Sequence, residues 1–206
     1  MYIAMSQLLL FWLSALILAM TPGVDVIFIA SQSMISRKNG ILAVLGTTTG
    51  IAIYILLTIL GLTLILQHSP LLYNAIRYAG AIYLLYLAYL SFRSDGVIGR
   101  KILVDSVSAF ESYKKGFLTN ILNPKIGVFF VTFLPQFISV QMGHQGIQFL
   151  ILGISFLVIG GTVNSCYALL FYAFKDRIFK KITVLKVFNK IVAILFCLMA
   201  VKIVIN

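Results

Sequence analysis

Two charged side chains stand inside long apolar stretches of the sequence, and each lies beside a proline. Asp25 follows Thr21-Pro22-Gly23, and Lys125 directly follows Asn123-Pro124. An unpaired charge inside a bilayer costs at least about 2.5 to 3.5 kcal/mol, so such a side chain normally faces the protein interior and finds a partner. Asp25 and Lys125 are therefore candidate partners for each other or for a bound zwitterion.

The neighbouring proline and glycine residues can open the backbone to such a ligand. A proline removes an intrahelical hydrogen bond and frees a carbonyl group, and Gly23 lets the backbone approach a ligand closely. The amide end of a half-helix attracts a carboxylate, whereas freed carbonyls and Asp25 can face an ammonium group. Asp25 could also take up a proton, because burial disfavours the charged carboxylate. The alternative is a fixed ion pair between Asp25 and Lys125 that only orients two helices.

The composition places these residues in a membrane protein. Of the 206 residues, 61% are hydrophobic and only 10% are charged, and the mean hydropathy is +1.07, outside the range of water-soluble globular domains. A net charge of +11 would raise the question of nucleic acid in a soluble protein. Here the basic residues fall in short clusters between apolar segments, so we expect a bilayer as partner and no nucleic acid.

Six segments have the length needed to cross a bilayer, with about 20 or more mostly apolar residues each. They are residues 6–36, 40–66, 71–92, 113–139, 146–174 and 184–205. The first would be roughly 45 Å long as one continuous helix, against a hydrocarbon core of about 30 Å, so we expect it to be broken or tilted. The prediction is a single all-α membrane domain over residues 1–206, with a linker at 93–112 between three-helix halves at 6–92 and 113–205.

The charges of the connections predict the topology. Lys and Arg gather in the first, third and fifth connections, near residues 37–38, 93–115 and 175–190, whereas the connections at 67–70 and 140–145 contain neither. Positively charged connections face the cytoplasm. We therefore expect the linker to be cytoplasmic and both termini to lie outside.

The two prolines occupy corresponding places in the two halves. Aligned on Pro22 and Pro124, both stretches read as a polar residue, proline, a variable residue, an aliphatic residue and then an apolar run. Because each half has three spans, the second half must enter from the opposite side, which gives a 3+3 inverted repeat with spans 1 and 4 broken at the prolines. Broken helices at matching positions are the best sequence pointer to the midplane site of a secondary transporter. The alternative is that the prolines only kink helices for packing.

The second and fifth spans carry further polar residues. Thr47, Thr48 and Thr49 stand between Gly46 and Gly50, a pattern typical of close helix packing, with the hydroxyl groups bonded back to carbonyls of their own helix. A role for a threonine in lining a substrate site is the alternative. Asn164, in the fifth span, is a second lining candidate.

Several motifs occur in the order of a known family. They are Thr21-Pro22-Gly23-Val24-Asp25, Gly46–Gly50, Arg77–Leu87, Gly116-Phe117, Asn123-Pro124-Lys125 and Leu134-Pro135-Gln136-Phe137. Along nearly the whole chain this set resembles the LysE/RhtB family of bacterial amino-acid exporters. The family commonly has a second proline where this chain has Val24, so we expect the first helix to be less rigidly broken here.

The resemblance implies a small exporter of the bacterial inner membrane that expels amino acids or close derivatives. It implies the proton-motive force as energy source and no other cofactor. It also places Asp25 and Asn123-Pro124-Lys125 in the transport site, with Gln136 as a further lining candidate, and leaves room for a homo-oligomer. Which amino acid is exported, and with which coupling ion, the resemblance does not specify.

Other functions fit the residues less well. There is no catalytic constellation or phosphate loop, which argues against an enzyme. Spans 1 and 4 contain no cysteine pair to carry reducing equivalents, and one intramembrane Asp is too little for a metal exporter, so we expect no metal site. A transporter of another small solute or cation on the same fold, or a membrane scaffold that transports nothing, stays open.

Overall fold

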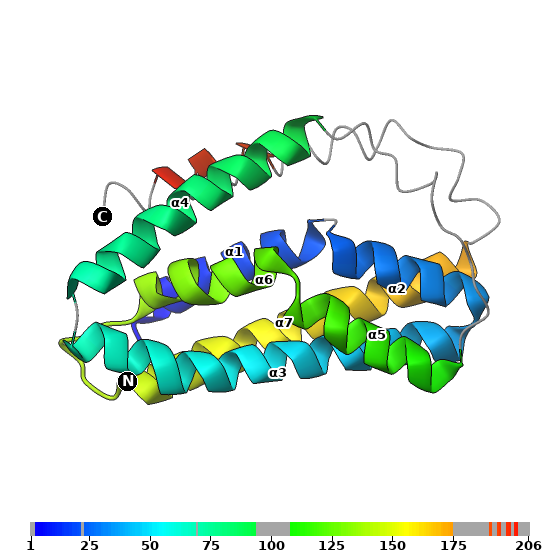
Figure 1. Ribbon diagram of the computed structural model, residues 1–206, viewed down its shortest axis with the longest axis horizontal. Coiled ribbons are helices and arrows are strands. Elements are labelled where there is room, and N and C mark those ends of the chain that lie inside the picture. The colour runs from blue at the N-terminus through cyan, green and yellow to red at the C-terminus, as the bar shows by residue number, and fades with distance from the viewer. Residues whose placement is uncertain are drawn as a thin grey trace.

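The fold is described here from a computed structural model. It describes residues 3–21, 23–68, 70–93 and 108–174, together with 190, 193, 194, 197, 198, 200 and 201. All regular structure in these residues is helical (Figure 1), which confirms the predicted all-α class.

The helices of the first half are α1 (Met5–Met20), α2 (Val24–Ile35), α3 (Arg37–His68) and α4 (Pro70–Arg93). The second half contains α5 (Ala109–Ile121), α6 (Pro124–Val128), the π-helix η1 (Phe129–Phe133), the 3-10 helix η2 (Leu134–Phe137) and α7 (Gln145–Ala173). The predicted segment 184–205 lies largely outside the described residues.

Two helices are by themselves long and apolar enough to cross a membrane, namely α3 over Arg37–Gly61 and α7. Two further spans arise if each bent pair counts as one. The pair α1 and α2 is bent by 54°, and the pair formed by α5 and Pro124–Phe137 is bent by 48°. The described residues thus contain two to four candidate spans of a multi-pass membrane protein.

Both expected breaks are present. The first separates Met20 from Val24, and its flanking residues Thr21 and Gly23 are extended; Pro22 itself lies outside the described residues. Val24 is the first residue of α2. Proline is common at this position, but a helix can start there without it. The missing second proline therefore does not close the break.

The second break ends at Pro124, which opens α6. Proline is well suited to a first helical position because the amide that it lacks would have no partner there. The side-chain oxygen of Asn123 accepts a hydrogen bond from the Lys125 amide at 3.0 Å and so caps this helix. The predicted break at Pro124 is confirmed, and it is a capped helix start.

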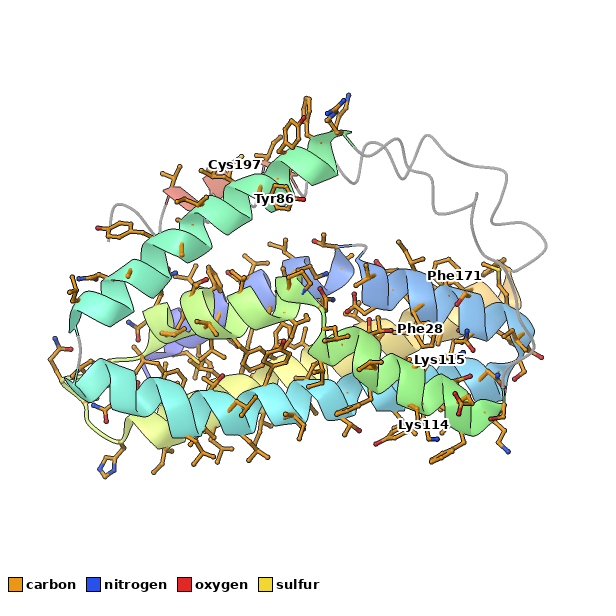
Figure 2. All side chains as sticks on the ribbon, in the orientation of Figure 1. Phe28, Tyr86, Lys114, Lys115, Phe171 and Cys197 are labelled. Carbon is orange, nitrogen blue, oxygen red and sulfur yellow. The ribbon has the colours of Figure 1, made fainter. Side chains whose placement is uncertain are left out.

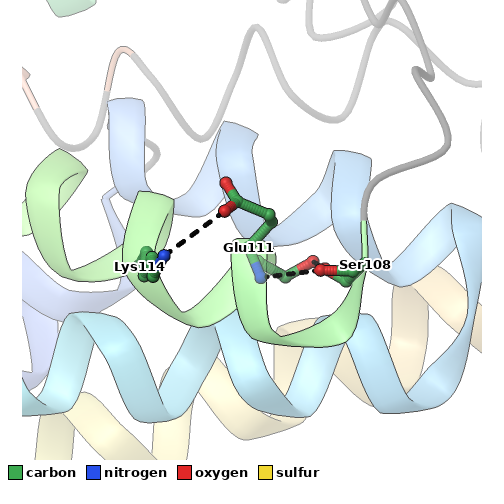
Figure 3. A network of polar contacts seen from close by, with 4 residues as sticks. Ser108, Glu111 and Lys114 are labelled. Atoms are coloured by element: carbon green, nitrogen blue, oxygen red, sulfur yellow. Dashed lines mark hydrogen bonds and ion pairs between the residues drawn. The ribbon is translucent and has the colours of Figure 1, made fainter.

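Two helices begin earlier than the apolar pattern predicts. Ser36 Oγ accepts from Asn39 N at 3.1 Å, so α3 starts at Arg37 instead of at residue 40. Ser108 Oγ accepts from Glu111 N at 3.2 Å, and α5 starts at Ala109 instead of at residue 113 (Figure 3). Capping serines extend both helices into polar sequence, which hydropathy alone does not reveal. The Ser108 cap places the start of α5 inside the predicted linker.

The broken segments flank a central pair of helices. Helix α3 packs against α7, and it also packs extensively against α5; α1 and α2 both contact α7. The chain runs from α1 to α2 in one direction along the molecule and from α5 to α6 in the opposite direction (Figure 1). The exposed Lys114 and Lys115 lie on α5 toward the end where α3 begins with Arg37 and Lys38 (Figure 2). Bases from the first and third connections thus share one end.

Glycines bring α3 and α5 into backbone contact. A β-carbon on Gly46 would overlap the carbonyl oxygen of Tyr113, and one on Gly116 would lie 2.5 Å from the carbonyl oxygen of Ala43. The hydroxyl groups of Thr47, Thr48 and Thr49 bond back to carbonyls of α3 at 2.8 to 2.9 Å. The prediction that this motif forms a close helix–helix contact is confirmed.

Candidate functional site

The two breaks meet at the Lys125 ammonium group. Lys125 Nζ donates to the carbonyl oxygens of Thr21 at 2.9 Å and Leu18 at 3.3 Å. These carbonyls belong to the C-terminal end of α1, where the last carbonyls of a helix lack partners in the helix itself. The negative end of the helix dipole stabilises a cation at this position. A lysine of the fourth segment therefore caps the broken helix of the first.

Asp25 lies at the opposing helix end. It is in the first turn of α2 and only 5% exposed, and the positive end of a helix dipole favours a carboxylate there. Its Oδ1 atom is buried and accepts no hydrogen bond. Asp25 and Lys125 form no ion pair, since the one ion pair among the described residues joins Lys114 to Glu111 at 3.5 Å. The alternative of a fixed Asp25–Lys125 pair is not what the structure contains.

Gly23 separates the carboxylate from the ammonium. A β-carbon on Gly23 would lie 2.9 Å from Asp25 Oδ1 and 3.1 Å from Lys125 Nζ. The φ of Gly23 is −135°, an extended conformation that any residue adopts, so the backbone does not require glycine here. What glycine provides is room, and that room lies between two buried groups of opposite charge.

Two asparagines at the second break also have unused polar atoms. Asn120 is completely buried, and both Oδ1 and Nδ2 of its side chain lack hydrogen-bond partners, as does Nδ2 of Asn123. Together with Asp25 Oδ1 these are all the buried side-chain polar atoms without a partner in the described part of the chain. Each such atom in a native structure calls for a water, an ion or a ligand, and all of them lie at the two breaks.

The sequence interpretation missed two residues at the breaks. Asn120 lies near the C-terminal end of α5, three residues before Asn123, and this spacing was a usable signal. Tyr167 of α7 donates to the carbonyl oxygen of Met20 at 2.7 Å and so satisfies another C-terminal carbonyl of α1. Nothing in the sequence separates it from the other tyrosines.

The structure brings some predicted residues together and not others. Thr21, Gly23, Asp25 and Lys125 meet at the first break, and Asn123 caps the helix that carries Lys125. The α3 threonines bond within their own helix, and Gln136 Nε2 donates to the Thr132 carbonyl four residues back at 2.9 Å. Asn164 is buried on α7, and among the described residues no hydrogen bond joins it to Asp25 or Lys125. The lining role of these residues stays a prediction.

A second buried polar cluster connects α2, α3 and α5 near the end of the molecule that carries Arg37, Lys38, Lys114 and Lys115, which we call the basic end. The hydroxyl group of Ser112, which is fully buried, donates to Gln32 Oε1 at 2.8 Å and accepts from Asn39 Nδ2 at 3.0 Å. Asp25 precedes Gln32 by two helical turns on the same buried face. Between them, Ile29 packs with Ala43 of α3 and Ala168 of α7. Apolar packing thus lies between the Ser112 cluster and the first break along α2.

Broken membrane helices at corresponding positions of two halves are typical of secondary transporters. A family model described as LysE type translocator matches residues 16–206. The chain belongs to this family, whose members are transporters and not enzymes, and both the resemblance and the expectation of no enzymatic activity are thereby confirmed.

Curated relatives of the chain carry the name leucine efflux protein. Those of Salmonella typhimurium, Salmonella choleraesuis and Salmonella typhi are each 32% identical over 169 residues, which cover 74% of this chain and 78% of the relative. No solved structure matches the chain significantly.

Proposed function

We propose that this protein exports amino acids or close derivatives across the bacterial inner membrane, with leucine as the first substrate to test. Membership in a translocator family and relatives named leucine efflux protein support export of an amino acid. The observation that carries the proposal is the unpartnered Oδ1 of Asp25, which faces the Lys125 ammonium across the space at Gly23.

The substrate is a zwitterion held between the two helix ends. Its ammonium group lies toward Asp25 and the carbonyl end of α1, and its carboxylate lies toward Lys125 and the free amides that open α2. Both charges of an amino acid thereby receive a partner in a region where an unpaired charge is costly. Neither a simple sugar nor an inorganic cation uses both ends of this site.

Export proceeds by alternating access of two three-helix halves in a six-span, inverted 3+3 arrangement. The opposite directions of α1–α2 and α5–α6 support this topology. We place the end that carries Arg37, Lys38, Lys114 and Lys115 in the cytoplasm and both termini outside, by the positive-inside rule. The proton-motive force drives the cycle.

Dipeptide loading tests the proposal. Cells that express the protein and are fed leucine-containing dipeptides should release leucine faster than cells with an empty vector. Asp25→Asn removes the charge at nearly constant volume and should reduce this release to the vector level, whereas the matched variant Glu111→Gln, which removes a carboxylate whose side chain is 43% exposed, should export normally. Export by Asp25→Asn at the wild-type rate would show that the carboxylate has no role in transport.

Proton coupling is tested separately in proteoliposomes. An imposed pH gradient should drive leucine transport by the wild type, and a protonophore should abolish it. If transport persists unchanged after the gradient has collapsed, export is not coupled to protons, while the assignment of an amino-acid substrate stands.

A further inference from the structure

We propose that the Lys125 ammonium group occupies the binding position of the substrate's ammonium group when no substrate is bound. On the proposed function, on which this inference rests, the α1 carbonyls bind the ammonium of an amino acid. In the structure those carbonyls are occupied by the protein's own ammonium group, at 2.9 Å from Thr21 O and 3.3 Å from Leu18 O. The substrate must therefore exchange with Lys125 at this position.

The geometry shows how the exchange begins. A lysine ammonium has three donors, and two of them are used on the carbonyls. Gly23 carries no side chain, and the position of its absent β-carbon lies between Lys125 Nζ and the unpartnered Asp25 Oδ1. An arriving zwitterion places its carboxylate against Lys125 and its ammonium against Asp25 as the ends of these two side chains move apart. The two ammonium groups then exchange places at the end of α1.

Charge balance makes the exchange selective. Lys125 is buried, and a buried cation that loses its partner without gaining another is strongly destabilised. A zwitterion supplies a partner for Lys125 through its carboxylate, whereas a plain amine adds a second cation and leaves Asp25 to balance both charges. Lys125 therefore excludes amines and cations that lack a carboxylate, although the carbonyls and Asp25 alone would bind them.

The same exchange affects the two broken spans. Lys125 belongs to α6 and the carbonyls belong to α1, so the empty site is bridged by a side chain of the protein. Binding replaces this bridge with one that passes through the substrate. Lys125 is thus a specificity-determining residue whose role differs from that of a fixed cap on α1.

Binding of leucine and of isopentylamine, which is leucine without its carboxylate, tests the inference. The purified protein is titrated with each ligand by calorimetry. The wild type should bind leucine and bind isopentylamine at least about 100-fold more weakly, as expected for a cation left unpaired. Lys125→Met, which keeps the length of the side chain and removes its charge, should bind isopentylamine about 100-fold more tightly than the wild type does. Lys125→Arg should reject the amine as the wild type does.

Two results would overturn the inference. One is an amine that binds the wild type as tightly as leucine, a measurement that needs no variant. The other is a folded Lys125→Met protein, or Lys125→Gln if the methionine variant is not obtained folded, whose affinity for the amine is unchanged, because a fixed cap would give that outcome. If the wild type instead exports no amino acid from dipeptide-loaded cells, the proposed function fails, and that failure is distinct from both.

Discussion

Gly23→Ala is the most informative single change in this protein, because it adds one methyl group between Asp25 and Lys125. The new carbon would lie 2.9 Å from Asp25 Oδ1 and 3.1 Å from Lys125 Nζ. Both atoms are the ends of side chains that can move by a few tenths of an ångström, and φ of −135° suits alanine. We therefore expect the protein to fold with its stability almost unchanged.

The affinity for substrate should instead decrease. An extra methyl group in a filled site typically costs about 1 to 3 kcal/mol, which corresponds to roughly 5- to 150-fold in affinity. Transport by Gly23→Ala in proteoliposomes should show a KM raised by about this factor. The control is Gly61→Ala on α3, where a β-carbon would meet nothing within 4 Å. A Gly23→Ala protein with the KM and rate of the wild type would refute a substrate site between Asp25 and Lys125.

Three further changes test the packing around the site. Gly46→Ala places a methyl group against the backbone of α5 and should destabilise the detergent-solubilised protein by about 1 to 3 kcal/mol, measured as a lower melting temperature than that of Gly61→Ala. Ser112→Ala leaves buried partners on α2 and α3 unsatisfied and should cost about 1 to 3 kcal/mol; Ser165→Ala, on an exposed hydroxyl, should be neutral. Glu111→Gln removes the exposed ion pair with Lys114 (Figure 3) and should shift stability by less than about 1 kcal/mol.

Hydropathy and proline spacing were enough to predict the helical class and the broken spans. The excess length of segment 6–36 over the bilayer required a break, and the structure has one between Met20 and Val24. The helix starts were not predictable in this way, because capping by Ser36 and Ser108 depends on one hydrogen bond each and leaves no mark in an apolar window. The sequence also pointed to Asp25 and Lys125 but not to how they are placed.

The placement of these two residues depends on distances across the fold that spacing along the chain does not contain. A sequence view pairs an acid with a base because each charge needs a partner inside a membrane. Such a view overlooks the helix ends created by a break, which can also act as partners for a charge. The spacing of Asn120 and Asn123 marks Asn120 as a residue near the second break, but its unsatisfied amide becomes visible only when every contact around it is known.

Two opposed helix ends explain why Asp25 and Lys125 can face one another without forming a pair. The break exposes the carbonyl end of α1 and the amide end of α2 side by side, and each end stabilises one of the two charges through its dipole and its free backbone groups. Lys125 is held by the Leu18 and Thr21 carbonyls, and Asp25 sits in the first turn of α2. A contact ion pair would use up both side chains, whereas charges held by backbone stay available. The broken helix thus maintains a separated acid and base in an apolar interior, and a zwitterion fits that arrangement better than a ligand with one charge.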